Sequence, residues 1–217
     1  MESTEYTFDE LLCQSLLLFR QSRFYDNCQE SEVEAYKMLE EAKLLINKTH
    51  DSVDMAKWGC TFECLVQKYY INGDTDNILG DIDVTLINFW KKVDASNVGV
   101  FPIYLWLGYY FLLRLKNRQS SCHVRCKRIM SDILSFLIEF FHKYRNRSVP
   151  MSVLALFTVD VWGETVYWVE LVHNSSLCEK QSGALLRQLY NLSQTELAQN
   201  RAKPDSLLQR ILEFYCF

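Results

Sequence analysis

The chain has 217 residues, and 49% of them are hydrophobic and 14% aromatic, which is enough apolar material for a substantial core. Its net charge of −4 at pH 7 argues against general binding to the phosphate backbone of nucleic acid. Neither long apolar stretch qualifies as a membrane span. Residues 98–113 fall short of the roughly 20 residues that a span needs and contain Pro102, and residues 153–169 carry Asp160 and Glu164 near their middle.

Eight cysteines in a chain of this length would suggest disulfide bonds in a secreted protein. The first residues, "MESTEYTFDELL", have acidic side chains where a signal peptide has a basic region followed by an apolar one. We therefore expect a cytoplasmic protein with reduced cysteines.

Apolar residues recur at spacings of three and four along nearly the whole chain, which is the period of a helix. A first helix is predicted to end near Phe24. A second is predicted to begin at Ser31, because Ser31 and Glu34 have the spacing of a capping box. A third is predicted from about Val53 to Ile71.

Gly73 marks the stop before a fourth helix, whose apolar residues run from Ile78 to Trp90. Pro102 suits the first turn of a fifth helix, which continues to about Leu115. The remaining predicted helices cover about 121–144, the region after Pro150, about 177–192, and a short segment from Pro204 to Phe214.

This order of eight or nine helices with short connections predicts an all-α protein. Connections of a few residues return each helix alongside its neighbour, so we expect antiparallel helical hairpins. No strict internal repeat and no low-complexity linker is visible, which predicts a single helical domain over residues 1–217.

Two segments between residues 58 and 116 resemble parts of the N-terminal half of bacterial lanthionine synthetase C-like proteins. They read "WGCTFECLVQKYYINGDTDNILGDIDVTLINF" and "VGVFPIYLWLGYYFLLRLK". The features shared with that family are an aromatic-Ile-x-Gly-Asp turn, a helix similar to "ILEDID" and a Gly-containing apolar helix similar to "YLLRL". The matching residues are Trp58, Gly59, Leu65, Gly73, Asp74, Asp76, Leu79, Asp81, Ile82, Asp83, Gly99, Gly108, Tyr109, Leu112, Leu113, Arg114 and Leu115.

The resemblance implies an incomplete α/α toroid of about eight helices. Full-length members of the family that form thioethers use a zinc ion held by two cysteines and one histidine, in Trp-Cys-Tyr-Gly-like and Cys-His-Gly segments. Neither segment occurs in this sequence. The resemblance therefore implies a non-catalytic accessory or binding protein without a cofactor, which engages a peptide or a peptide-maturation partner.

The alternative is a zinc-dependent, thioether-forming enzyme whose ligands have moved to other positions. Cys60 and Cys64 are four residues apart, as are Cys122 and Cys126, so each pair would share one face of a helix. If the two helices are adjacent, the two faces would form a zinc site of four cysteines, or of three cysteines and His123. The simpler interpretation is that these are buried or surface thiols with no metal.

Aromatic and acidic residues of two helices form the candidate binding surface. The surface consists of Trp106, Tyr109, Tyr110, Asp160, Trp162, Glu164, Tyr167 and Trp168. Two alternatives stay open: the aromatic side chains form the core between helices, and Asp160 with Glu164 is either an acid/base pair or a polar helix edge. Because an incomplete ring would leave apolar surface uncovered, we expect a peptide or protein partner or self-association.

Two further groups of charged residues have simpler explanations. Asp74, Asp76, Asp81 and Asp83 lack the spacing of a calcium-binding loop, so we expect helix capping and a solvated helix face. The basic stretch at residues 114–128 is either an anion-binding or partner-binding face or a solvated helix end.

Overall fold

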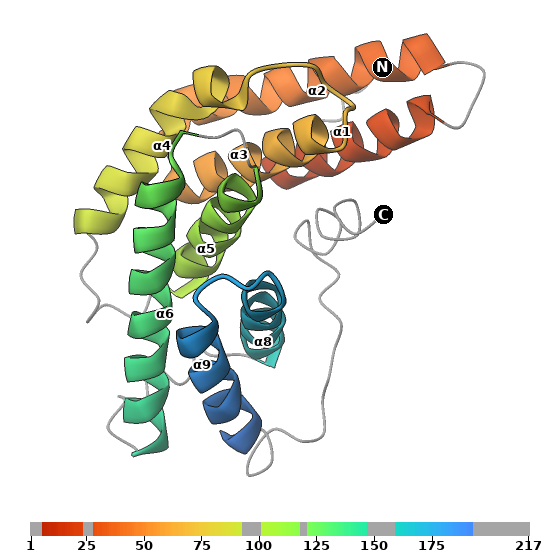
Figure 1. Cartoon of the computed structure of the whole chain (residues 1–217). Coiled ribbons are helices and arrows are strands. Elements are labelled where there is room, and N and C mark those ends of the chain that lie inside the picture. The colour runs from red at the N-terminus through yellow and green to blue at the C-terminus, as the bar shows by residue number, and fades with distance from the viewer. Residues whose placement is uncertain (1–5, 24–27, 93–100, 118–120, 147–158, 193–217) are drawn as a thin grey trace. The chain divides into compact units, whose positions relative to one another are not determined.

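The computed structural model describes residues 6–23, 28–92, 101–117, 121–146 and 159–192. All regular structure in these ranges is helical, which confirms the all-α prediction (Figure 1). None of the described helices is both long and apolar enough to cross a membrane. The toroid stays a prediction.

The helix bounds agree with the periodicity to within a few residues at most ends. The described helices are α1 (Phe8–Ser22), α2 (Cys28–Thr49), α3 (Ser52–Gln67), α4 (Thr75–Lys92), α5 (Phe101–Lys116), α6 (His123–Arg145), α8 (Val159–Asn174) and α9 (Glu179–Leu192). Pro102 lies in the first turn of α5, as predicted. The predicted helix starts at Pro150 and Pro204 lie outside the described residues.

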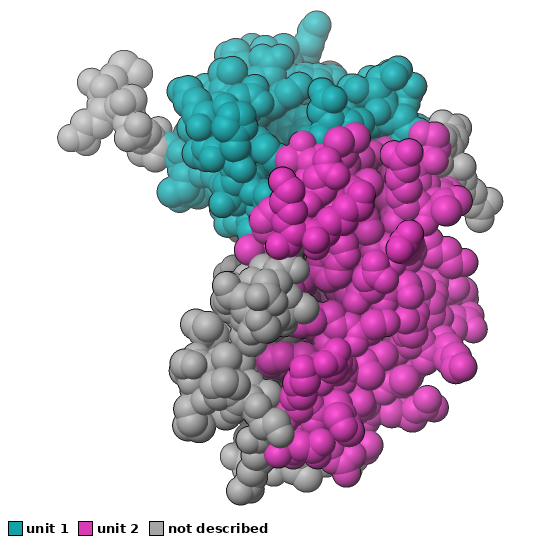
Figure 2. All heavy atoms as spheres, turned by 90° about the vertical axis from the view of Figure 1, so that its left-hand side faces the viewer, with its two compact units in different colours: residues 1–82, 205–217 teal, residues 83–204 magenta. Residues whose placement is uncertain are grey.

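The chain divides into two compact units (Figure 2). The division, between residues 82 and 83, falls within α4. Of the described residues, 6–82 belong to unit 1 and 83–192 to unit 2. The prediction of one domain over the whole chain stays a prediction.

In unit 1, α2 returns alongside α1 and α3 packs against both (Figure 1). The apolar face of α1 is buried through Leu12, Leu16 and Phe19. Trp58 of α3 is also buried, stacks on Phe62 with ring centroids 5.2 Å apart, and donates its indole N–H to a carbonyl oxygen of α2 at 3.1 Å. The helical pattern therefore produces a three-helix core.

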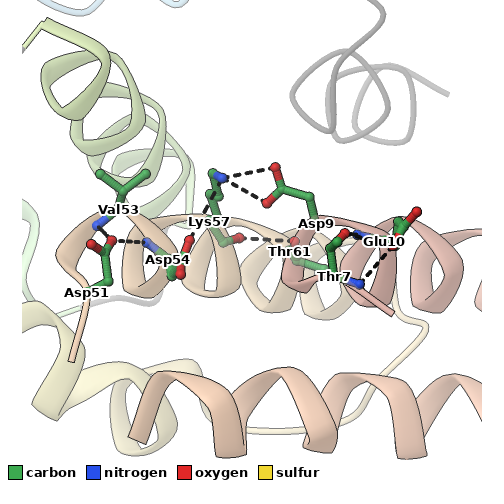
Figure 3. A network of polar contacts seen from close by, with 8 residues as sticks. All are labelled: Thr7, Asp9, Glu10, Asp51, Val53, Asp54, Lys57 and Thr61. Carbon is green, nitrogen blue, oxygen red and sulfur yellow. Dashed lines mark hydrogen bonds and ion pairs between the residues drawn. The ribbon is translucent and has the colours of Figure 1, made fainter. Parts of the chain in front are cut away.

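The structure shows a capping box at α1. The Thr7 hydroxyl accepts from the Glu10 backbone N–H, and the Glu10 carboxylate accepts from the Thr7 backbone N–H at 2.8 Å. The predicted box at Ser31 and Glu34 is wrong, because α2 begins at Cys28 and places both residues inside the helix. Figure 3 shows the Thr7 cap beside Lys57 of α3, whose ammonium lies 2.8 Å from the Asp9 carboxylate and so joins α3 to α1.

The C-terminus of α3 comes one turn earlier than the pattern predicts. Tyr69 has a left-handed backbone with φ of 60°, and its side chain is 83% exposed. The Tyr70 N–H bonds to the Leu65 carbonyl and the Tyr69 N–H to the Val66 carbonyl, which is the hydrogen-bond pattern of a Schellman motif. Tyr69 continues the apolar spacing of α3 in the sequence, although the helix has already ended at Gln67. The spacing therefore predicted too long a helix.

In unit 2, α5 is the central helix. It packs against α6 and α8, and α9 packs against the same two helices. Successive α5 residues from Leu107 to Arg114 are all buried, including Tyr110 and Phe111. A helix that is apolar on every side is typical of a core position, which explains why this stretch resembled a membrane span in sequence.

The contact between α5 and α8 depends on a glycine. A Cβ atom at Gly108 would lie 2.6 Å from the indole ring of Trp168, which is fully buried. The absence of a side chain at Gly108 therefore lets the fully buried Trp168 ring pack directly on the α5 backbone.

We predict that Gly108→Ala destabilises the protein by about 1–3 kcal/mol, because the new methyl group overpacks a rigid aromatic contact. Gly80→Ala is the matched control, since Gly80 also lies inside a helix but a Cβ there meets nothing within 4 Å. That control should be neutral or stabilising by up to about 1 kcal/mol through helix propensity. Urea unfolding measures both values, and equal effects of the two variants would contradict the packing argument.

Candidate functional site

A buried ion pair joins the middle of α4 to α5. The Arg114 guanidinium donates from Nε to one Asp83 oxygen at 3.2 Å and from a terminal nitrogen to the other at 2.8 Å. The Tyr110 hydroxyl donates to Asp83 Oδ1 at 2.6 Å. Arg114 and Tyr110 have no exposed surface and Asp83 is 6% exposed. Both carboxylate oxygens are therefore engaged by groups from one face of α5.

The sequence places these groups by helical spacing. Asp83 lies on the buried stripe of α4, four residues after Leu79 and three before Leu86. Tyr110 and Arg114 are four residues apart, so they share a face of α5. The expectation of a solvated Asp83 is wrong, because this carboxylate lies on the apolar side of its helix.

The basic stretch at residues 114–128 is not one continuous exposed face, because Arg114 is buried. Arg125, Lys127 and Arg128 are exposed. The other three aspartates of the α4 region fit the expectation of helix capping and a solvated helix face better. They are Asp74, Asp76 and Asp81. Asp74 caps the helix by accepting from the Asp76 backbone N–H at 3.0 Å.

The electrostatic surroundings keep the Tyr110 hydroxyl protonated. Burial, followed by the neighbouring Asp83 charge, raises the pKa of Tyr110 well above its ordinary value of 10.0. An ionised tyrosine here would face the Asp83 carboxylate inside the buried core. Tyr110 therefore serves as a hydrogen-bond donor to Asp83, and the bidentate Arg114 contact compensates the carboxylate charge.

Two cysteine thiols lie at the start of α6, beside the ion pair. Cys122 immediately precedes the helix, and its carbonyl accepts from the Cys126 backbone N–H at 3.0 Å. The two Sγ atoms are 3.2 Å apart. The hydrogen bond with Cys122, together with burial, raises the pKa of Cys126 far above its ordinary value. His123 contacts the Asn117 carbonyl through Nε2.

The other cysteine pair predicted from sequence belongs to unit 1. Cys60 and Cys64 are both fully buried on α3. Burial raises the pKa of the Cys60 thiol, and the neighbouring Cys64 and Glu63 add to that shift. Among the described residues, no three His, Cys, Asp or Glu side chains come together in a group that would hold a metal ion.

The candidate binding surface divides into buried and exposed members. Tyr109, Tyr110, Trp162 and Trp168 are at most 7% exposed. They contribute to ring contacts of the core, such as the edge-to-face contact between Trp162 and Phe141 at 5.4 Å. A surface role for these four is therefore wrong, and they occupy the core that the sequence analysis gave as the alternative.

Three members of that surface stay accessible. Trp106 and Glu164 are half-buried on α5 and α8, and Tyr167 is 39% exposed. Tyr109 lies beneath the first two, because its ring packs near Trp106 and its hydroxyl is 3.5 Å from the Glu164 carbonyl oxygen. The Asp160 side chain is outside the described residues.

The comparisons with known proteins give no relative for this chain. No family model matches it, and neither the curated proteins nor the solved structures contain a significant match.

We predict that Asp83→Leu destabilises the protein by about 3–5 kcal/mol, because it leaves a buried guanidinium without its counter-charge. The double variant Asp83→Leu with Arg114→Met should be clearly more stable than Asp83→Leu alone, since no buried charge remains. Glu139→Gln removes the exposed pair with Lys143 and should leave the unfolding midpoint unchanged. Chemical unfolding of the parent, Asp83→Leu, Arg114→Met, the double variant and Glu139→Gln measures the coupling, and additive effects of the two single variants would refute the pair's role.

We also predict a tyrosine contribution to alkaline unfolding. The folded state holds the Tyr110 proton more tightly than the unfolded state does, so stability should fall as the pH rises past about 10. Tyr110→Phe should lose about 1 kcal/mol near pH 8 through the missing hydrogen bond but show a shallower decline above pH 10. Urea midpoints at the two pH values test this, with the exposed Tyr69→Phe variant as the control. An unchanged slope in Tyr110→Phe would count against the buried hydroxyl.

Proposed function

We propose that this chain is a non-catalytic helical binding protein, similar to a truncated lanthionine synthetase C-like protein, that engages a peptide or a peptide-maturation partner. The observation that carries the proposal is the state of the buried acid in unit 2. Both Asp83 oxygens accept from Arg114, and one also accepts from Tyr110. A carboxylate fixed in this way supports the fold and is poorly placed to take a proton from a substrate.

The burial of the thiols of unit 1 also supports a non-catalytic role. A zinc ligand or nucleophile has to be a thiolate, and burial raises the pKa of the Cys60 thiol. Cys64 beside it is fully buried as well. These two side chains fit a packed helix interface better than a metal centre.

The accessible surface of unit 2 supports a binding role. Tyr109 of α5 packs near the Trp106 ring and donates its hydroxyl to the Glu164 backbone carbonyl of α8. A partly exposed indole on one helix and an acidic residue on the next suit a peptide that carries both an apolar and a cationic side chain. We place the contact surface at Trp106, Glu164 and Tyr167.

The zinc content of protein purified under reducing conditions separates this proposal from the zinc-enzyme alternative. We expect elemental analysis to find no stoichiometric zinc, and the same result in the Cys60→Ser and Cys122→Ser variants. One zinc per chain that is lost in either variant would overturn the non-catalytic proposal and establish relocated ligands.

A further inference from the structure

The pair Cys122 and Cys126 has the geometry of two thiols that can join. Their Sγ atoms are 3.2 Å apart, and a disulfide bond requires them to approach to about 2.0 Å. Four residues of helix advance by about 6 Å, which lies within the Cα separation of roughly 4.4–6.8 Å found in disulfides. The remaining movement is therefore about 1 Å between the sulfur atoms.

The two thiols differ in access to solvent. Cys122 is half-buried at the edge of the helix, whereas Cys126 has no exposed surface and points into unit 2. Cys122 also lies outside the helix proper, because α6 begins at His123. Its carbonyl accepts from the Cys126 backbone N–H, so the approach of the two sulfur atoms has to come mainly from rotation of the Cys122 side chain. The exposed residues Arg125, Lys127 and Arg128 put positive charge on the first turns of α6.

From this arrangement we infer that Cys122 and Cys126 form a reversible oxidation site for peroxides, with Cys122 as the attacking thiol and Cys126 as the resolving thiol. The inference does not depend on the proposed binding function. It assigns a modification site to the "SSCHVRC" segment.

The chemistry takes place in two steps. The Cys122 thiolate attacks one oxygen of hydrogen peroxide, so that an S–O bond forms, the O–O bond breaks, and the leaving hydroxide takes up a proton as water. The Cys126 sulfur then attacks the Cys122 sulfur, forming the S–S bond and breaking the S–O bond. The second hydroxide leaves with the Cys126 proton as water. Two thiols are oxidised and one peroxide is reduced to two waters, and an external thiol reverses the change.

The sequence supplies a direct readout of this bond. Trypsin cleaves after Arg118, Arg125 and Lys127, so the two cysteines fall on separate peptides, residues 119–125 and 126–127. After treatment of the full-length reduced protein with one equivalent of hydrogen peroxide, acid quenching and alkylation, we expect these two peptides to be joined. Reduction before alkylation should separate them.

Three variants test the order of events, with circular dichroism to confirm that each is folded. In Cys126→Ser, a dimedone probe should label Cys122 as a trapped sulfenic acid. In Cys122→Ser, Cys126 should stay reduced. Cys178→Ser is the matched control, because Cys178 is another half-buried thiol of unit 2, and it should form the 122–126 bond as fast as the parent protein.

Joined peptides 119–125 and 126–127 at one equivalent of peroxide, in the parent and in Cys178→Ser, support the inference. Oxidation of Cys13 or Cys178 before the pair would overturn it. So would accumulation of Cys122 sulfinic acid without the disulfide, or dimedone labelling of Cys126 in Cys122→Ser.

Discussion

The burial of the Arg114 guanidinium is the constraint on which unit 2 depends. A cation without exposed surface needs a counter-charge and hydrogen-bond acceptors, and the Asp83 carboxylate provides both through two contacts. Because Asp83 lies on α4 and Arg114 on α5, the ion pair fixes the register between these helices. Tyr110 adds a third contact from the same face of α5.

The central position of α5 follows from this anchor and from one small residue. One face of α5 holds the ion pair, and Gly108 lets Trp168 of α8 pack on its backbone. The buried charged groups of this interior, Asp83 and Arg114, hold α4 and α5 together. Accessible chemistry is then left to the edges of the helices, where Trp106, Glu164 and Cys122 lie. This division is the basis of the two proposals, a binding surface on α5 and α8 and a reactive thiol at the start of α6.

Helical periodicity predicted the fold class and most helix bounds, since each amphipathic or apolar stretch fits one element. It failed at the start of the second helix. Ser31 and Glu34 have the spacing of a capping box, yet α2 begins about one turn earlier, at Cys28. The site was harder to predict. Four aspartates near α4 look alike as residue types, and only the position of Asp83 between Leu79 and Leu86 indicated burial. Aromatic composition likewise does not distinguish a core indole such as Trp168 from an exposed one, because burial depends on tertiary packing. The spacing of Cys122 and Cys126 indicated a shared helix face, but their difference in burial comes from packing.

Hydrogen exchange at the Arg114 side chain tests the central claim most directly. The Nε–H resonance, assigned by its absence in Arg114→Lys, should persist in heavy water long after that of the exposed Arg125 has exchanged, because the buried contact with Asp83 opens only with the helix pair. Exchange of the two groups at the same rate would contradict a buried ion pair and the account of unit 2 that rests on it.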